Sequence, residues 1–161
     1  MVVIIPVLLL AMLAADGPAT EFSRYPGEPV LVGVAAPPDV SSGKARKFRT
    51  VLREAAKEGP NFNGHYRVAH WGCGTNCIEW AIIDLKTGAV WFAPQPALSC
   101  WALDEPDDVV VHDWFETRIE SKLLYLYICD PPFHGPRTEN TREVYVWEES
   151  GMKKLRSDKL P

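Results

Sequence analysis

The chain has 161 residues, with 17 basic and 21 acidic side chains and a formal net charge of -4. This acidic balance argues against nucleic acid as the main partner, because nucleic-acid binding needs a concentrated positive surface. The length suits one domain with a substantial hydrophobic core.

Residues 2–14 form an apolar run that is followed by Ala15 and the polar Asp16. A run of this length is typical of a signal peptide and is too short to span a bilayer, although no Lys or Arg precedes it here. The alternative is a buried strand or helix, which Pro6 and the lack of polar alternation disfavour. We expect a signal peptide at residues 1–15 and a single mature domain at residues 16–161. The mature protein would be periplasmic or extracellular, with no membrane span.

The first expected elements are a short strand over residues 30–35 and an amphipathic helix over residues 44–58. The helix is predicted from an apolar stripe at helical spacing, and Gly59-Pro60 should end it. The stripe consists of Phe48, Val51, Leu52, Ala55 and Ala56. The other face of the helix is basic, which indicates either a solvated surface or docking to an anionic partner.

The rest of the chain reads as β-strands. Residues 65–71 alternate, and residues 78–84 form the nearly continuous apolar run of a central strand, with a hairpin turn at residues 84–88. Further strands are expected at residues 90–93, 109–111, 114–120, 123–129, 143–147 and 152–155, and a long loop at residues 130–141. The predicted fold class is α+β, mainly β: an antiparallel meander of about seven or eight strands with one amphipathic helix packed on it.

Residues 59–77 hold four of the eleven glycines, two of the four cysteines and two of the four histidines. The segment reads GPNFNGHY, then WGCGTNC, and IDLKTG follows at residues 83–88. In these motifs the chain resembles a family of small secreted bacterial proteins that share a G-P-N-F-x-G-H-Y, W-G-C-G-x-x-C, I-D-x-x-T-G pattern. The resemblance implies a secreted domain and implies no particular reaction.

Four cysteines in an exported chain indicate two disulfides, for which three pairings are formally possible. We predict Cys73 with Cys77 and Cys100 with Cys129. An extended chain would place the first pair about 13 Å apart, whereas a bridge needs roughly 7 Å or less, so the intervening residues must turn sharply. Loop closure predicts about 2 kcal/mol for the short bridge and about 3.6 kcal/mol for the long one.

The stapled loop of residues 72–77, here called the hairpin tip, is our leading candidate for a binding element. Thr75 and Asn76 have side chains free to contact a partner, while the flanking glycines have none. The candidate binding residues are Asn63, His65, Tyr66, Trp71, Gly74, Thr75 and Asn76. The partner would be a protein or an envelope glycan, for which tryptophans could provide a stacking platform. An inhibitor-like or immunity-like role would suit such a scaffold by analogy.

The main alternative is a small secreted hydrolase that uses His65 with a strand carboxylate or with Cys73. Against this, a histidine at such a junction more often hydrogen-bonds its neighbours and holds the turn in place. Two further alternatives are zinc binding at His65, His70, Cys73 and Cys77, and thiol-disulfide exchange. Oxidation of the cysteines and the three-residue spacing disfavour them, so we expect no metal and no cofactor.

Overall fold

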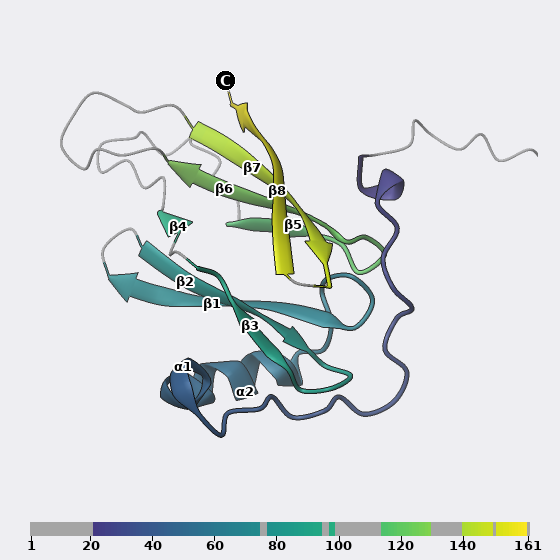
Figure 1. Cartoon of the computed structure of the whole chain (residues 1–161), viewed down its shortest axis with the longest axis vertical. Helices are drawn as coiled ribbons and strands as arrows, with labels where there is room; N and C mark the ends of the chain where they lie inside the picture. Colours follow the sequence, from purple (N-terminus) through teal and green to yellow (C-terminus); the bar gives the residue numbers. More distant parts are fainter. Residues whose placement is uncertain are drawn as a thin grey trace, which may run out of the picture.

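The computed structural model describes residues 21–74, 77–94, 97–98, 114–129, 140–149 and 151–160. These residues form two antiparallel sheets of four strands each and a pair of short helices. Figure 1 shows three layers, with the helices lowest, the first sheet in the middle and the second sheet above. The α+β, mainly-β class predicted from the sequence is therefore confirmed.

The first sheet is built around its second strand. It contains β1 (Tyr66–Gly74), β2 (Cys77–Asp84), β3 (Val90–Phe92) and β4 (Ala97–Leu98). β2 pairs with β1 on one side and with β3 and β4 on the other. Both faces of β2 are buried, which explains its continuous apolar run. The predicted hairpin turn after Asp84 is confirmed, with Gly88 at a φ of 84°.

The second sheet has the strand order β5-β6-β7-β8. Its members are β5 (Phe115–Thr117), β6 (Leu123–Cys129), β7 (Asn140–Glu148) and β8 (Gly151–Lys159). β8 is longer than the sequence predicts, because its charged, largely exposed residues lack the apolar alternation that marks a strand. The strand expected at residues 109–111 and most of the loop expected at residues 130–141 lie outside the described residues.

The main core lies between the two sheets. Phe62, together with Trp80 and Ile82 of β2, packs against Leu124 and Leu126 of β6. The meander is thus divided into two sheets that pack face to face, as in a sandwich. Ala81 and Ile83 of β2 point the other way, into a second apolar cluster between the first sheet and the helices.

The predicted helix over residues 44–58 is interrupted. It forms α1 (Gly43–Lys47) and α2 (Arg49–Lys57), separated at Phe48, which leaves helical geometry with φ -101° and ψ 21°. Phe48 nevertheless packs against Trp71 of β1, with ring centroids 4.7 Å apart. The apolar stripe faces the first sheet as expected. The helix ends where predicted, with Gly59 at a φ of 78°.

A short 3-10 helix, η1 (Glu21–Arg24), comes before an irregular segment of residues 27–40, here called the strap. The prediction of a strand at residues 30–35 was wrong. The strap makes widely spaced backbone hydrogen bonds to residues that flank β1 and β2, including Leu31 N–H to Gly64 O and Ala36 N–H to Leu85 O. Gly33, at a φ of 99°, departs from strand geometry within it. No helix among the described residues is long and apolar enough to cross a membrane.

Candidate functional site

The hairpin tip joins β1 to β2. The predicted disulfide between Cys73 and Cys77 is confirmed, with a Cα–Cα distance of 5.2 Å. The strand register is irregular between Gly72 and Gly74, so that Gly74 faces Cys77 directly. Gly72, Cys73 and Gly74 are exposed. Thr75 and Asn76 lie outside the described residues, as does Cys100, so its pairing with Cys129 stays a prediction.

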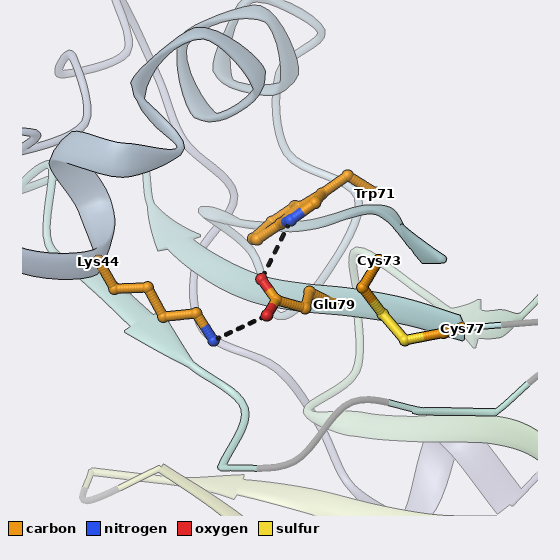
Figure 2. The surroundings of a disulfide bond; sticks show 5 residues. All are labelled: Lys44, Trp71, Cys73, Cys77 and Glu79. Carbon is orange, nitrogen blue, oxygen red and sulfur yellow. Dashed lines mark hydrogen bonds and ion pairs between the residues drawn. A yellow bond between two sulfur atoms is a disulfide. The ribbon is translucent and has the colours of Figure 1, made fainter. Parts of the chain in front are cut away.

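Trp71 lies just before the tip and has a packing role. Its ring contacts Phe48 and also meets Phe92 edge-on at 6.2 Å, and its Nε1–H donates to Glu79 Oε2 at 3.2 Å. Glu79 also pairs with Lys44 at 3.7 Å. Figure 2 shows Trp71, Glu79 and Lys44 close to the disulfide. The half-buried indole therefore fixes the helices to the base of the hairpin.

Asn63 and Gly64 of the GPNFNGHY motif are buried and make hydrogen bonds to two other segments of the chain. Asn63 has a φ of 42°, and its Oδ1 accepts the Glu28 N–H at 2.9 Å. The backbone N–H groups of Asn63 and Gly64 donate to the loop of residues 118–121. A side chain at Gly64 would collide with the carbonyl oxygens of Glu28 and Pro29. The motif thus joins the strap to the loop that leads into β6.

His65 lies between two carboxylates and is 4% exposed. Its Nδ1 is 2.8 Å from Asp84 Oδ1, and its Nε2 is 2.8 Å from Glu28 Oε2. Its carbonyl oxygen accepts the Leu85 N–H. Both ring nitrogens are therefore engaged, and the imidazole links the strap to the β2–β3 turn.

Asp84 is the hub of that turn. Besides His65, it accepts hydrogen bonds from the N–H groups of Lys86 and Thr87 and from the Thr87 hydroxyl. Partial burial acts to raise the pKa of Asp84, but the bonds from Thr87, Lys86 and His65 together outweigh it, and the net pKa is lowered. Asp84 is therefore held in its ionised form by the fold.

Tyr66 stacks on His65, with ring centroids 4.2 Å apart, and contacts Trp147 of β7 at 5.1 Å. Burial, together with the negative charges of Glu28 and Asp84, raises the pKa of the Tyr66 phenol. Its ring packs against the core between the sheets. Asn63, His65 and Tyr66 are thus brought together, whereas Trp71 and Gly74 lie farther along β1, toward the tip.

The geometry separates His65 from Cys73, one of the two partners that the hydrolase hypothesis gives to this histidine. Cys73 is eight residues beyond His65 along an extended strand, which corresponds to about 26 Å, and its sulfur is bonded to Cys77. A strand carboxylate, Asp84, does lie beside His65, but Glu28 occupies the other ring nitrogen. Among the described residues, no three His, Cys, Asp or Glu side chains are grouped to hold a metal ion.

The aromatic platform expected for a glycan is not seen on the described surface. Trp91 contacts both Trp80 and Trp147 edge-to-face, and all three pack in or against the core between the sheets. The large apolar side chains that are exposed among the described residues are all aliphatic: Val30, Val32, Val34 and Leu155. Trp101 lies outside the described residues.

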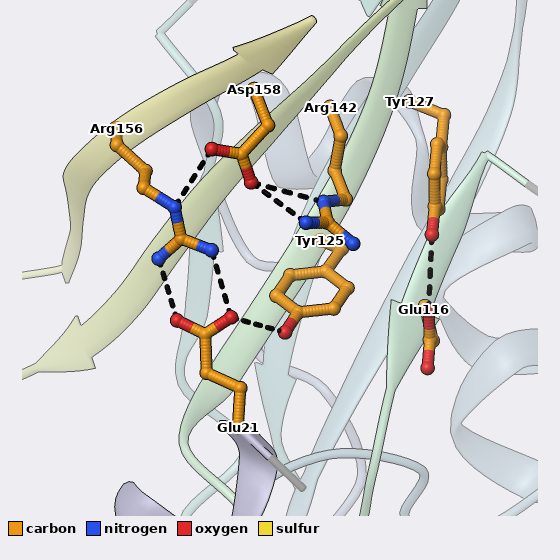
Figure 3. A network of polar contacts seen from close by, with 7 residues as sticks. All are labelled: Glu21, Glu116, Tyr125, Tyr127, Arg142, Arg156 and Asp158. Atoms are coloured by element: carbon orange, nitrogen blue, oxygen red, sulfur yellow. Dashed lines mark hydrogen bonds and ion pairs between the residues drawn. The ribbon is translucent and has the colours of Figure 1, made fainter. Parts of the chain in front are cut away.

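Sequence reasoning missed Glu28 and a second polar network on the outer face of the second sheet. There Arg156 of β8 makes a bidentate contact with Glu21 of η1, at 2.5 and 2.7 Å, and Tyr125 donates to the same carboxylate. Asp158 connects Arg156 to Arg142. Figure 3 shows this arrangement beside the bond from Tyr127 to Glu116. These partners are too far apart in the chain for a local pattern to reveal them.

Comparisons with protein-family models, with curated proteins and with solved structures gave no match to this chain.

Proposed function

We propose that this protein is an exported, disulfide-stapled binding domain that presents the hairpin tip to a protein partner. The observation that carries the proposal is the division of the motif-rich segment into two parts. Its first part, Asn63 to Tyr66, is occupied with internal contacts. Its second part, Gly72 to Gly74, is exposed and is held by the Cys73–Cys77 bridge.

A protein partner fits the described surface better than an envelope glycan. Sugar rings bind to exposed aromatic faces, and the described tryptophans are packed against the cores. A stapled loop loses little conformational entropy on binding, because the bridge has already restricted it. The tip therefore suits a partner that offers a complementary groove or pocket.

Export and the periplasmic or extracellular location belong to the same proposal. The apolar run of residues 2–14 supports export, and the oxidised pair at the tip is compatible with an oxidising compartment. An inhibitor-like or immunity-like role is the kind of activity such a loop would serve.

The hydrolase remains the second candidate, because one observation favours it. A buried histidine bonded to an ionised aspartate is the arrangement that prepares an imidazole for proton transfer. In that case Glu28, whose side chain is 48% exposed, would have to move aside to let a substrate reach Nε2.

Site-specific photo-crosslinking in the producing cells tests the binding proposal. Gly72 suits the probe, because nothing lies within 4 Å of the position where its side chain would begin. A benzoylphenylalanine at position 72 should give one discrete protein adduct, and the same probe at exposed Lys153 of β8 should give none. Loss of the adduct in the C73S/C77S variant would support the role of the bridge.

Equal adducts from positions 72 and 153, or none from either, would contradict the proposal. The hydrolase candidate would instead be favoured if the H65A variant were fully folded and lost a hydrolytic activity that the unaltered protein shows.

A further inference from the structure

The helices carry a strong local charge on an acidic protein. Residues 43–58 contain six basic and two acidic side chains, a net +4, whereas the whole chain is -4, so the remainder carries -4 - 4 = -8. Both acidic side chains already have partners. Glu54 pairs with Lys57 at 2.7 Å, and Glu58 pairs with Arg67 of β1.

Four basic side chains on the outer face are left without a carboxylate among the described residues. They are Arg46, Lys47, Arg49 and Arg53. All four are exposed, and Lys47 Nζ lies 4.9 Å from the centroid of the Phe48 ring. A cluster of positive charge like this is expected on a protein that binds an anionic surface.

The strap adds exposed apolar groups to the same side of the molecule. Val30, Val32 and Val34 are 50%, 94% and 98% exposed, and they alternate with Leu31 and Ala35, which pack inward. Single exposed valines are ordinary, but three in five residues form a ridge. The strap and the helices cover the same apolar cluster of the first sheet, on the side away from the second sheet (Figure 1).

We propose that this face, made of the helix cations and the strap valines, docks onto the surface of an anionic phospholipid bilayer. Unpaired cations are attracted to the lipid headgroups, and small aliphatic side chains can enter the boundary between headgroups and acyl chains. An acidic protein would satisfy the cations, but it would need a matching apolar groove for the valines. A bilayer surface offers both features without shape matching.

This inference does not depend on the hairpin tip being a binding element. Docked through its helices, the domain would lie flat with the second sheet turned away from the lipid. The attachment would be peripheral and weakened by salt, because it depends on exposed charges. We expect raising the salt to about 0.5 M to release most of the protein.

Vesicle co-sedimentation tests the proposal with the chain lacking residues 1–15, because that apolar run would itself bind lipid. The probes are vesicles of phosphatidylcholine with an equal part of phosphatidylglycerol, and vesicles of phosphatidylcholine alone. We expect binding to the first and little to the second.

Two variants separate the contributions of charge and of the apolar ridge. The variant R46Q/K47Q/R49Q/R53Q should weaken binding at least about tenfold, given roughly 1 kcal/mol for each basic residue at such a surface. The variant V32S/V34S should weaken it several-fold without changing the salt dependence. The control R24Q/K122Q/K153Q/K159Q removes the same charge elsewhere and should bind within about twofold of the unaltered chain. Circular dichroism checks that each variant is folded.

Equal binding to both vesicle types would overturn the proposal, and so would equal weakening by the four-residue variant and its control. Binding to soluble polyglutamate with no binding to anionic vesicles would also overturn it, and would assign the face to an acidic protein instead. If V32S/V34S bound as tightly as the unaltered chain, the apolar half of the proposal would be wrong. The photo-crosslinking result at position 72 is unaffected by any of these outcomes.

Discussion

Glycines with the same unusual backbone conformation have different surroundings in this protein. Gly64 has a φ of 77° and lies against the strap, where an added Cβ would be 2.6 Å from the Pro29 carbonyl oxygen. Gly33 has a φ of 99° and has no atom within 4 Å of the same position. The first glycine is needed for space as well as for its backbone angle, and the second for the angle alone.

We therefore expect G64A to destabilise the protein much more than G33A. The positive φ costs each variant about 1 to 2 kcal/mol, and the collision with the strap adds at least about 2 kcal/mol for G64A. Urea unfolding followed by tryptophan fluorescence measures both. Equal losses would mean that the strap moves aside freely and that the motif glycine does not hold it.

The N-terminal 3-10 helix is attached to the last strand by charge. Two hydrogen bonds from Arg156 are the main cause that lowers the pKa of Glu21 to about 2; partial burial opposes them, and the Tyr125 hydroxyl adds to them. Because the folded-state pKa lies below the usual value of 4.5, this stabilisation is present above about pH 4.5 and is lost as the pH falls toward 2.

The E21Q variant should thus show a smaller loss of unfolding free energy between pH 4.5 and pH 2 than the unaltered protein. The difference between the two proteins should be greatest near neutral pH. Urea midpoints measured across this range check the prediction, with E120Q, at an exposed loop position, as the control. Parallel profiles for E21Q and the unaltered protein would contradict it.

The Cys73–Cys77 disulfide and the predicted Cys100–Cys129 pair would close very different lengths of chain. Removing the Cys73–Cys77 bridge should cost about 2 kcal/mol, because it closes a loop of only a few residues. If Cys100 pairs with Cys129, C100A should lower the melting temperature more than C73A, since about thirty residues would regain their freedom. Calorimetry of the two variants gives the ranking, and the opposite order would argue against the Cys100–Cys129 pairing.

Elements with a local pattern were predictable, and elements defined by distant partners were not. The run of β2 and the turn at Asp84 to Gly88 are visible in the sequence because hydrophobicity and turn chemistry act locally. The strap was misread as a strand, because its alternation is genuine but its outward valines face solvent. The interruption of the helix at Phe48 could not be predicted, because no helix-breaking residue lies at that position.

At the scale of the whole molecule, the GPNFNGHY motif holds the layers together. Asn63 and His65 of the motif contact Glu28 of the strap, and the Asn61 carbonyl oxygen accepts a hydrogen bond from Thr117 of β5. The motif therefore links the strap and the second sheet to the first sheet. His65 and Glu28 are 37 residues apart, and Arg156 and Glu21 are 135 apart. A single sequence can suggest that such a motif matters, but its partners become visible only in the folded chain.

His65 has a structural role in this fold, whereas the hairpin tip is the proposed binding element. The H65A variant would leave Asp84 and Glu28 without the ring that they both contact and would remove the stacking on Tyr66. A loss of roughly 1 to 3 kcal/mol is expected when buried hydrogen bonds of this kind are broken. The matched control is H70A, since His70 belongs to the same part of the chain but is exposed on β1.

The most direct test is the free energy of unfolding of H65A, measured in urea beside H70A and the unaltered protein. We predict that H65A loses roughly 1 to 3 kcal/mol and that H70A loses clearly less. An H65A protein as stable as the unaltered chain would contradict the structural role of His65 and would make the hydrolase the better reading of the site.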